Sequence, residues 1–158
     1  MASIVSNLTF EELLPFFQIQ GGATVCLTEN LAAPGPGTGF PPATPTNIIK
    51  TSQGWSVAFQ WETLGALTNL MAGQFQLNLF LEEMGSGEYA LPAAFSTATV
   101  NFVSAPNVYN QVMNIPANQV PAGVYKLVVS LTFKGPLGVP GPIAAFSEVG
   151  MIQFYDSI

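Results

Sequence analysis

The chain has no histidine and no arginine, and its 158 residues include one cysteine and three lysines. Without imidazole it cannot form a Ser-His-Asp or Cys-His catalytic pair, and it lacks the usual ligands of zinc, copper and non-haem iron. Nucleic-acid binding needs clustered basic residues, whereas Lys50, Lys126 and Lys134 are spread along the chain. These absences predict a protein that is not an enzyme and has no metal, cofactor or nucleic-acid partner.

Other familiar signals are missing as well. The lone Cys26 excludes an intramolecular disulfide framework and is typical of a small buried hydrophobe. Residues 1–17 lack the basic segment of a secretory signal, and Glu11 and Glu12 interrupt their apolar stretch. No run of 18 or more apolar residues exists, so no membrane span is expected. We expect synthesis into the cytoplasm, with later export left open.

Charge of either sign is scarce. Charged residues make up 8% of the chain, against a usual value of about 25%, and the formal net charge is −6. Area–mass scaling predicts a folded surface of about 7,600 Å², which leaves roughly one charged residue per 630 Å². Apolar types make up 49% of the residues, more than the inner strand faces can absorb. Some apolar side chains are therefore expected to meet another protein.

Alternation of apolar and polar residues indicates half-buried strands. The clearest run is Tyr125, Leu127, Val129, Leu131 and Phe133. The predicted strands lie near residues 19–30, 55–62, 74–81, 98–103, 108–115, 125–134 and 151–155. Because the connections are mostly turns and loops rather than helical crossovers, the pairing should be antiparallel. The fold class predicted is an all-β antiparallel β-sandwich of about seven strands.

Residues 115–125 are expected to form a strand, a corner and a second strand. Pro116 and Pro121 flank this corner, which suits a crossing from one sheet to the other. The segment resembles corners of immunoglobulin-like and transthyretin-like sandwiches. That resemblance concerns one corner and the fold, and it implies no function.

The N-terminal segment carries a local helix signal. Thr9 and Glu12 form a capping box, Leu8 and Leu13 fit a hydrophobic staple, and Pro15 ends the helix after one or two turns. We predict an arm over residues 1–18 with this short helix, followed by one sandwich domain over residues 19–158. The arm either closes one end of its own core or docks on a neighbouring subunit. A Pro/Gly-rich loop is expected over residues 34–46.

Two groups of apolar residues are candidates for contact with a partner. Trp55 and Trp61 lie on one side of their strand, where they either pack in the core or form an aromatic platform. Val128, on an otherwise polar strand face, is a further candidate, and so are Ile143, Met151 and Ile158 toward the C-terminus. The predicted interaction residues are Phe10, Phe16, Phe17, Phe40, Trp55, Trp61, Phe80, Phe146 and Tyr155.

Three functional hypotheses follow. The first is a structural or self-assembly protein, a sandwich subunit of a homo-oligomer, filament or shell. The alternative is a binding module that recognises a protein, a glycan or a small apolar ligand. An enzyme would need two facing carboxylates, but adjacent Glu82 and Glu83 point to opposite faces of a strand and the other carboxylates are scattered.

Overall fold

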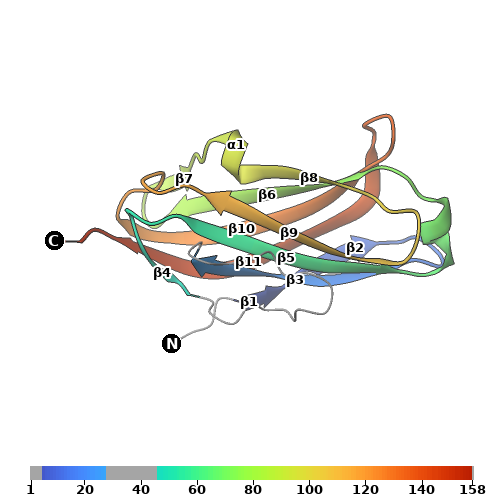
Figure 1. Cartoon of the computed structure of the whole chain (residues 1–158), viewed down its shortest axis with the longest axis horizontal. Coiled ribbons are helices and arrows are strands. Elements are labelled where there is room, and N and C mark those ends of the chain that lie inside the picture. The colour runs from blue at the N-terminus through green and yellow to red at the C-terminus, as the bar shows by residue number, and fades with distance from the viewer. Residues whose placement is uncertain (1–4, 28–45, 158) are drawn as a thin grey trace.

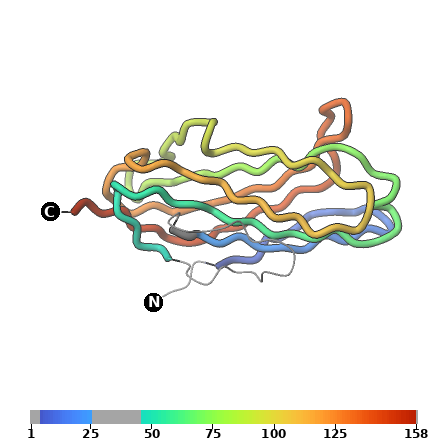
Figure 2. Tube along the Cα trace, viewed as in Figure 1, coloured from blue at the N-terminus to red at the C-terminus, as the bar shows by residue number. Residues whose placement is uncertain are grey.

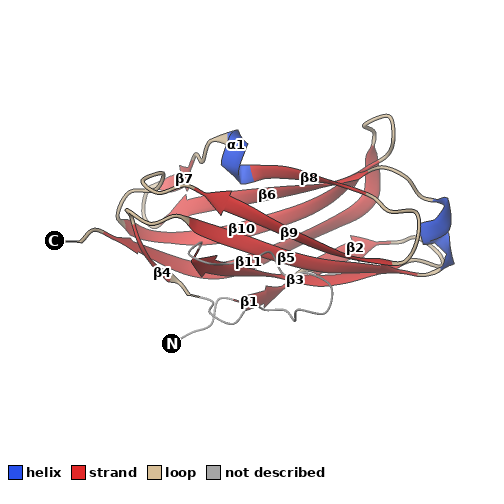
Figure 3. Cartoon of the chain, in the orientation of Figure 1, coloured by secondary structure: helices blue, strands red, loops and turns tan. Residues whose placement is uncertain are grey.

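Two β-sheets packed face to face make up the protein (Figure 1, Figure 3). The structure, a computed structural model, describes residues 5–27 and 46–157, with only the backbone described at Cys26 and Leu27. The predicted all-β antiparallel sandwich is confirmed. The Pro/Gly-rich loop predicted over residues 34–46 lies outside the described residues apart from Thr46, and so does Phe40.

The smaller sheet has four strands, and each pairs antiparallel with its neighbours. Its order is β1 (Val5–Asn7), β3 (Gln18–Leu27), β5 (Trp55–Leu64) and β9 (Asn107–Ile115). The residues that alternate along β5 lie opposite inward residues of β3 and β9, so Trp61 is flanked by Gly21 and Tyr109. This register directs one face of the sheet into the core.

The larger sheet has seven strands around the long central pair β10 and β11. The order along the sheet is β2 (Thr9–Glu12), β11 (Pro140–Tyr155), β10 (Gly123–Lys134), β6 (Gln74–Glu83) and β7 (Gly87–Tyr89). Two further strands complete the sheet: β4 (Ile48–Lys50) pairs with β11, and β8 (Thr97–Asn101) pairs with β6. All of these pairings are antiparallel except β4 with β11, which is parallel. Figure 2 traces the chain as it crosses between the sheets.

Helices are few and short. The 3-10 helix η1 (Ala66–Leu70) follows β5, and α1 (Ala93–Ser96) precedes β8. In the described ranges no helix has the length and apolar character needed to cross a membrane.

The seven predicted strands correspond to β3, β5, β6, β8, β9, β10 and β11. The described residues contain four further strands, β1, β2, β4 and β7, each only three or four residues long. Such short strands carry too few residues for alternation to show in the sequence.

The helix predicted at the N-terminus is wrong. Residues 9–12 form strand β2, which pairs with residues 143–146 of β11. A helix of one or two turns is marginal by itself, whereas pairing with β11 satisfies the backbone and packs Phe10 against the core. The arm thus joins both sheets of its own domain, since β1 pairs with β3.

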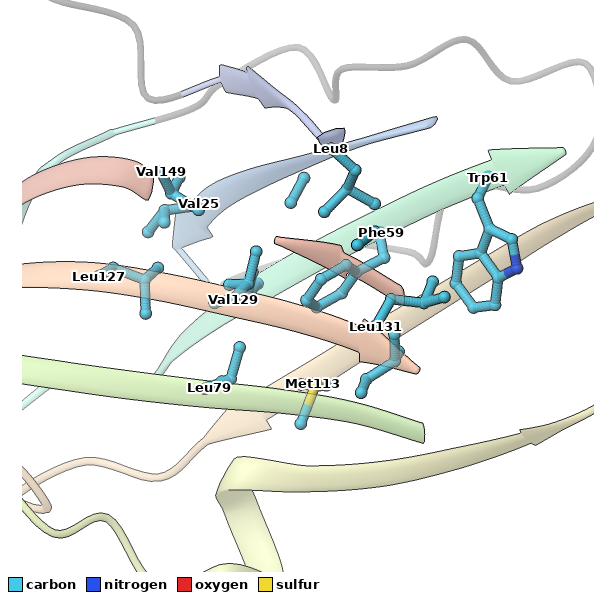
Figure 4. Close-up of a cluster of buried hydrophobic side chains, with 14 of the residues drawn as sticks. Leu8, Val25, Phe59, Trp61, Leu79, Met113, Leu127, Val129, Leu131 and Val149 are labelled. Carbon is cyan, nitrogen blue, oxygen red and sulfur yellow. The ribbon is translucent and has the colours of Figure 1, made fainter. Parts of the chain in front are cut away.

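The core fills the space between the sheets. Aliphatic side chains such as Val25, Leu79 and Val129 meet in its middle (Figure 4). Aromatic groups occupy the two ends. Near one end the ring centroids of Trp61 and Tyr109 are 5.3 Å apart, and near the other those of Trp55 and Phe154 are 5.4 Å apart. The two tryptophans therefore anchor opposite ends of one core.

The predicted corner joins β9 of the smaller sheet to β10 of the larger one. The Tyr125 hydroxyl donates to the Pro121 carbonyl over 3.0 Å, and Asn118 has a φ of 62°. This is a tyrosine corner, the hydroxyl contact back to the chain a few residues upstream that immunoglobulin-like sandwiches use. The corner therefore resembles those of immunoglobulin-like sandwiches in this hydrogen bond as well as in its two flanking prolines.

Candidate interaction surface

The outer face of the larger sheet carries several exposed apolar residues. Along β10, odd-numbered residues from Tyr125 to Phe133 are buried, so Val128 and its even-numbered neighbours point outward. Val128 lies directly opposite Phe80 of β6. On the other side of β10, Phe146 of β11 lies opposite Ser130 and is thus diagonal to Val128. Directly opposite and diagonal side chains on one face are within contact range for aromatic groups.

Phe80 lies opposite Val128, and Phe146 lies one diagonal step further, on the third of three neighbouring strands. We call these three residues the apolar row. Exposed Glu148 of β11 lies directly opposite Val128 and borders this row. Phe80 is 44% exposed and Phe146 is 53% exposed, while Val128 between them is half-buried. Exposed Met151 and Val124 lie further along β11 and β10 on the same face. Aromatic and Met side chains with little charge are the composition of protein interface cores.

The charges beside the apolar row are partly paired. Lys126 Nζ lies 3.2 Å from Glu148 Oε1, and Lys126 is also directly opposite Glu82 on β6. On the other side of the row, the Asn78 amide donates to the Ser130 hydroxyl. The ion pair therefore reaches the apolar row itself, because Glu148 lies directly opposite Val128, and neutral polar groups lie on the other side of the row.

A hollow of about 630 Å³ continues this surface toward the edge strand β2. Ala144 and Pro142 of β11 line it, together with Leu13, which is 97% exposed. Ala144 points outward two residues before Phe146 on the same strand, so the hollow adjoins the apolar row. It gives the face a recess beside a projecting aromatic side chain.

The structure brings together two of the predicted interaction residues, Phe80 and Phe146. Tyr155 is exposed at the end of β11, and Phe16 is exposed beyond β2 near η1. Phe10 is half-buried against the core. The sequence placed all of these near the surface but could not show which share a face.

The interaction role predicted for Phe17, Trp55 and Trp61 does not fit the structure. Their exposures are 4%, 1% and 0%, because both tryptophans point between the sheets and Phe17 packs into the same core. The Trp61 indole nitrogen has no hydrogen-bond partner among the described residues. Neither tryptophan offers a platform to a partner.

The chain matches no family model, and no curated protein matches it significantly. Among solved structures it is similar to the C-terminal domain of wzt, with a TM-score of 0.53 and 10% identity over 96% of this chain and 80% of that one. A CARDB domain from Pyrococcus furiosus has a TM-score of 0.42 and 9% identity, over 92% and 99% of the two chains. A Niemann-Pick type C2 protein from the Japanese carpenter ant has a TM-score of 0.41 and 8% identity, over 93% and 99%. The first likeness shows a shared fold alone, and the other two add nothing to it.

Proposed function

We propose that this chain is a non-enzymatic assembly protein whose copies associate face to face through the outer surface of the larger sheet. The observation that carries the proposal is the apolar row, in which Phe80 lies opposite Val128 and Phe146 lies diagonal to Val128, on three neighbouring strands of that surface. Exposed apolar surface of this kind marks protein interaction sites.

The size of the face suits a stable dimer. Four strands spaced by about 4.8 Å and nine residues rising about 3.3 Å each give a flat area of roughly 570 Å². Side-chain relief increases the accessible area above that value. The result is of the order of the about 800 Å² per partner that standard interfaces bury.

The charges of the face favour a second copy as the occupant. A two-fold contact brings the same residues of both copies together. Lys126 can then form an ion pair with Glu82 or Glu148 of the other copy. Its ammonium group thus has acidic partners across the contact as well as within its own copy.

The placement of the carboxylates supports a non-enzymatic role. No carboxylate among the described residues is buried, and Glu82, Glu88 and Glu148 are all exposed. A carboxyl group tuned for acid–base work is usually held in a water-poor pocket. These exposed side chains keep the protein acidic and hydrated instead.

Light scattering after size exclusion tests the proposal. Wild-type protein at tens of micromolar is expected to elute as a dimer or a larger species. Phe80→Lys and Phe146→Lys place a charge in the contact and should shift the mass to the 16.7 kDa of a single chain. Leu137→Lys is the matched control, because Leu137 is 91% exposed and lies in the hairpin between Lys134 of β10 and Pro140 of β11, outside the strands that carry the apolar row.

A wild-type protein that stays monomeric at several hundred micromolar overturns the proposal. Equal dissociation in Leu137→Lys would mean that added charge, rather than loss of the apolar row, separates the copies. Circular dichroism of each variant shows whether it is folded, so that unfolding is not mistaken for dissociation.

A further inference from the structure

A groove of about 620 Å³ lies on the smaller sheet, whereas the apolar row lies on the larger sheet. Phe10 lines both this groove and the hollow beside β2. The groove crosses β3, β5 and β9 near Gln20, Glu62 and Val108, and the turn from β1 to β2 borders it with Asn7 and Phe10. Gln20 lies opposite Glu62, and Glu62 lies opposite Val108. Three strands distant in sequence therefore contribute one continuous row to this groove.

Two glycines of β3 line the groove. Gly22 lies opposite Gln60 and is itself buried, whereas Gly21 lies opposite Trp61, whose side chain points into the core. At Gly21 a Cβ atom would lie 2.4 Å from the Gln60 carbonyl oxygen and 2.6 Å from the Trp61 Cβ, so the strands approach too closely for any larger residue. The groove is thus built into the strand packing.

The walls carry planar hydrogen-bonding groups. Gln20 Nε2 donates to Glu62 Oε2 over 3.2 Å, and Gln60 Nε2 donates to Asn110 Oδ1 over 2.9 Å. These contacts hold the four side chains in place. Asn110 does not line the groove and only orients Gln60. Among the described residues, no hydrogen bond occupies the Oε1 atoms of Gln20, Gln60 and Glu62. An amide offers both donors and acceptors, whereas a carboxylate offers acceptors.

The chemistry of the groove excludes several classes of ligand. No lysine lines it, and Glu62 together with the net charge of −6 repels anions. No group of three or more His, Cys, Asp or Glu able to hold a metal ion forms in the described part of the chain. A ligand with groups that both donate and accept hydrogen bonds fits these walls, and a neutral one meets no charge repulsion from Glu62.

We infer that the groove binds a neutral oligosaccharide. Each sugar hydroxyl both donates and accepts, which matches the alternating amide and carboxylate groups of Gln20, Gln60 and Glu62. Val108, which is 38% exposed, and half-buried Phe10 offer apolar contact to the C–H faces of a sugar ring. An apolar lining with a few placed polar groups is the usual construction of a small-ligand site.

Titration of ¹⁵N-labelled protein with cellotetraose, maltotetraose and mannotetraose tests the inference. At least one sugar is expected to shift the amide resonances of residues 20–22 and 60–62 in a saturable manner. Gln60→Ala and Glu62→Ala each remove one hydrogen-bonding wall and should weaken that binding by up to about tenfold.

Gln74→Ala is the matched control, because Gln74 forms an equivalent amide pair with Asn101 on the larger sheet, 3.0 Å apart. Binding should be unchanged in this variant. Absence of saturable shifts with all three sugars overturns the inference, as does equal weakening by Gln74→Ala. The association variants Phe80→Lys and Phe146→Lys should bind sugar like wild type, so failure of the assembly proposal and failure of this one are separable.

Discussion

Phe16 is held in a backbone conformation that its side chain does not favour. Its φ is 56°, in the left-handed region, and its carbonyl oxygen accepts a hydrogen bond from the Leu67 backbone N–H over 3.1 Å. The side chain is 80% exposed, so packing does not compensate for the backbone strain. The hydrogen bond from Leu67, at the start of η1, therefore stabilises the left-handed backbone of Phe16, while the aromatic ring stays in solvent.

We expect Phe16→Gly to raise the free energy of unfolding by about 0.5–1 kcal/mol. The left-handed conformation costs a non-glycine residue about 1–2 kcal/mol, and the added freedom of glycine in the unfolded chain offsets about half of that. Urea denaturation measures the change. A loss of stability in Phe16→Gly would show that the exposed ring makes a contact that stabilises the fold.

At the scale of elements, the corner between β9 and β10 determines how the two sheets are joined. Tyr125 is 1% exposed, and its hydroxyl bond to Pro121 ties the start of β10 to the preceding turn. Its ring also packs edge-on against Tyr89 and Phe154, at 5.8 Å and 5.6 Å between centroids. The Tyr125 side chain thus links the β9–β10 crossing to β7 and β11.

Tyr125→Phe should lower the free energy of unfolding by about 1 kcal/mol, since it removes one hydrogen bond and leaves the ring packing in place. Burial raises the pKa of Tyr125 above its ordinary value of 10.0, and the nearby Glu83 and Tyr89 add to this. The folded state then retains the phenol proton where the unfolded state releases it. Wild-type stability should therefore fall as the pH rises above 10, with a shallower fall in Tyr125→Phe.

Urea denaturation at neutral pH and at several values above pH 10 measures both effects. Tyr155→Phe serves as the control, because Tyr155 is 42% exposed and should change stability by less than about 0.5 kcal/mol. An unchanged stability of Tyr125→Phe at neutral pH would show that the corner does not depend on its hydroxyl.

The N-terminal arm shows how pairing between elements overrides a local signal. Thr9 and Glu12 have the spacing of a capping box, yet both lie in β2 against β11. A capping box contributes only near the end of a helix that forms for other reasons. The partner strand, more than 130 residues away in the chain, decides the outcome.

For the whole molecule, the net charge of −6 opposes association of copies. The Debye length falls from about 30 Å at 0.01 M salt to about 10 Å at 0.1 M, so added salt screens this repulsion. Burial of the apolar row does not depend on charge. Association should therefore strengthen as sodium chloride rises from 10 to 300 mM.

Sedimentation velocity over a dilution series at both salt concentrations measures this effect. Weaker association at the higher concentration would show that ion pairs such as those of Lys126, rather than the apolar row, hold the copies together. Phe146→Lys should show little association at either concentration.

The sequence by itself determined that seven main strands exist, which side of the four most regular ones is buried, and that charge is scarce outside, because these follow from local alternation and from composition. It predicted only residues 151–155 of the much longer β11 (Pro140–Tyr155). Only the tertiary structure decided which outward residues are neighbours. The register of β6, β10 and β11 places Phe80 opposite Val128 and Phe146 diagonal to it, and that of β3, β5 and β9 aligns Gln20, Glu62 and Val108. A shift of one residue in any strand would turn its side chains to the other face. Registers are set by packing between strands distant in the chain, which no local pattern contains.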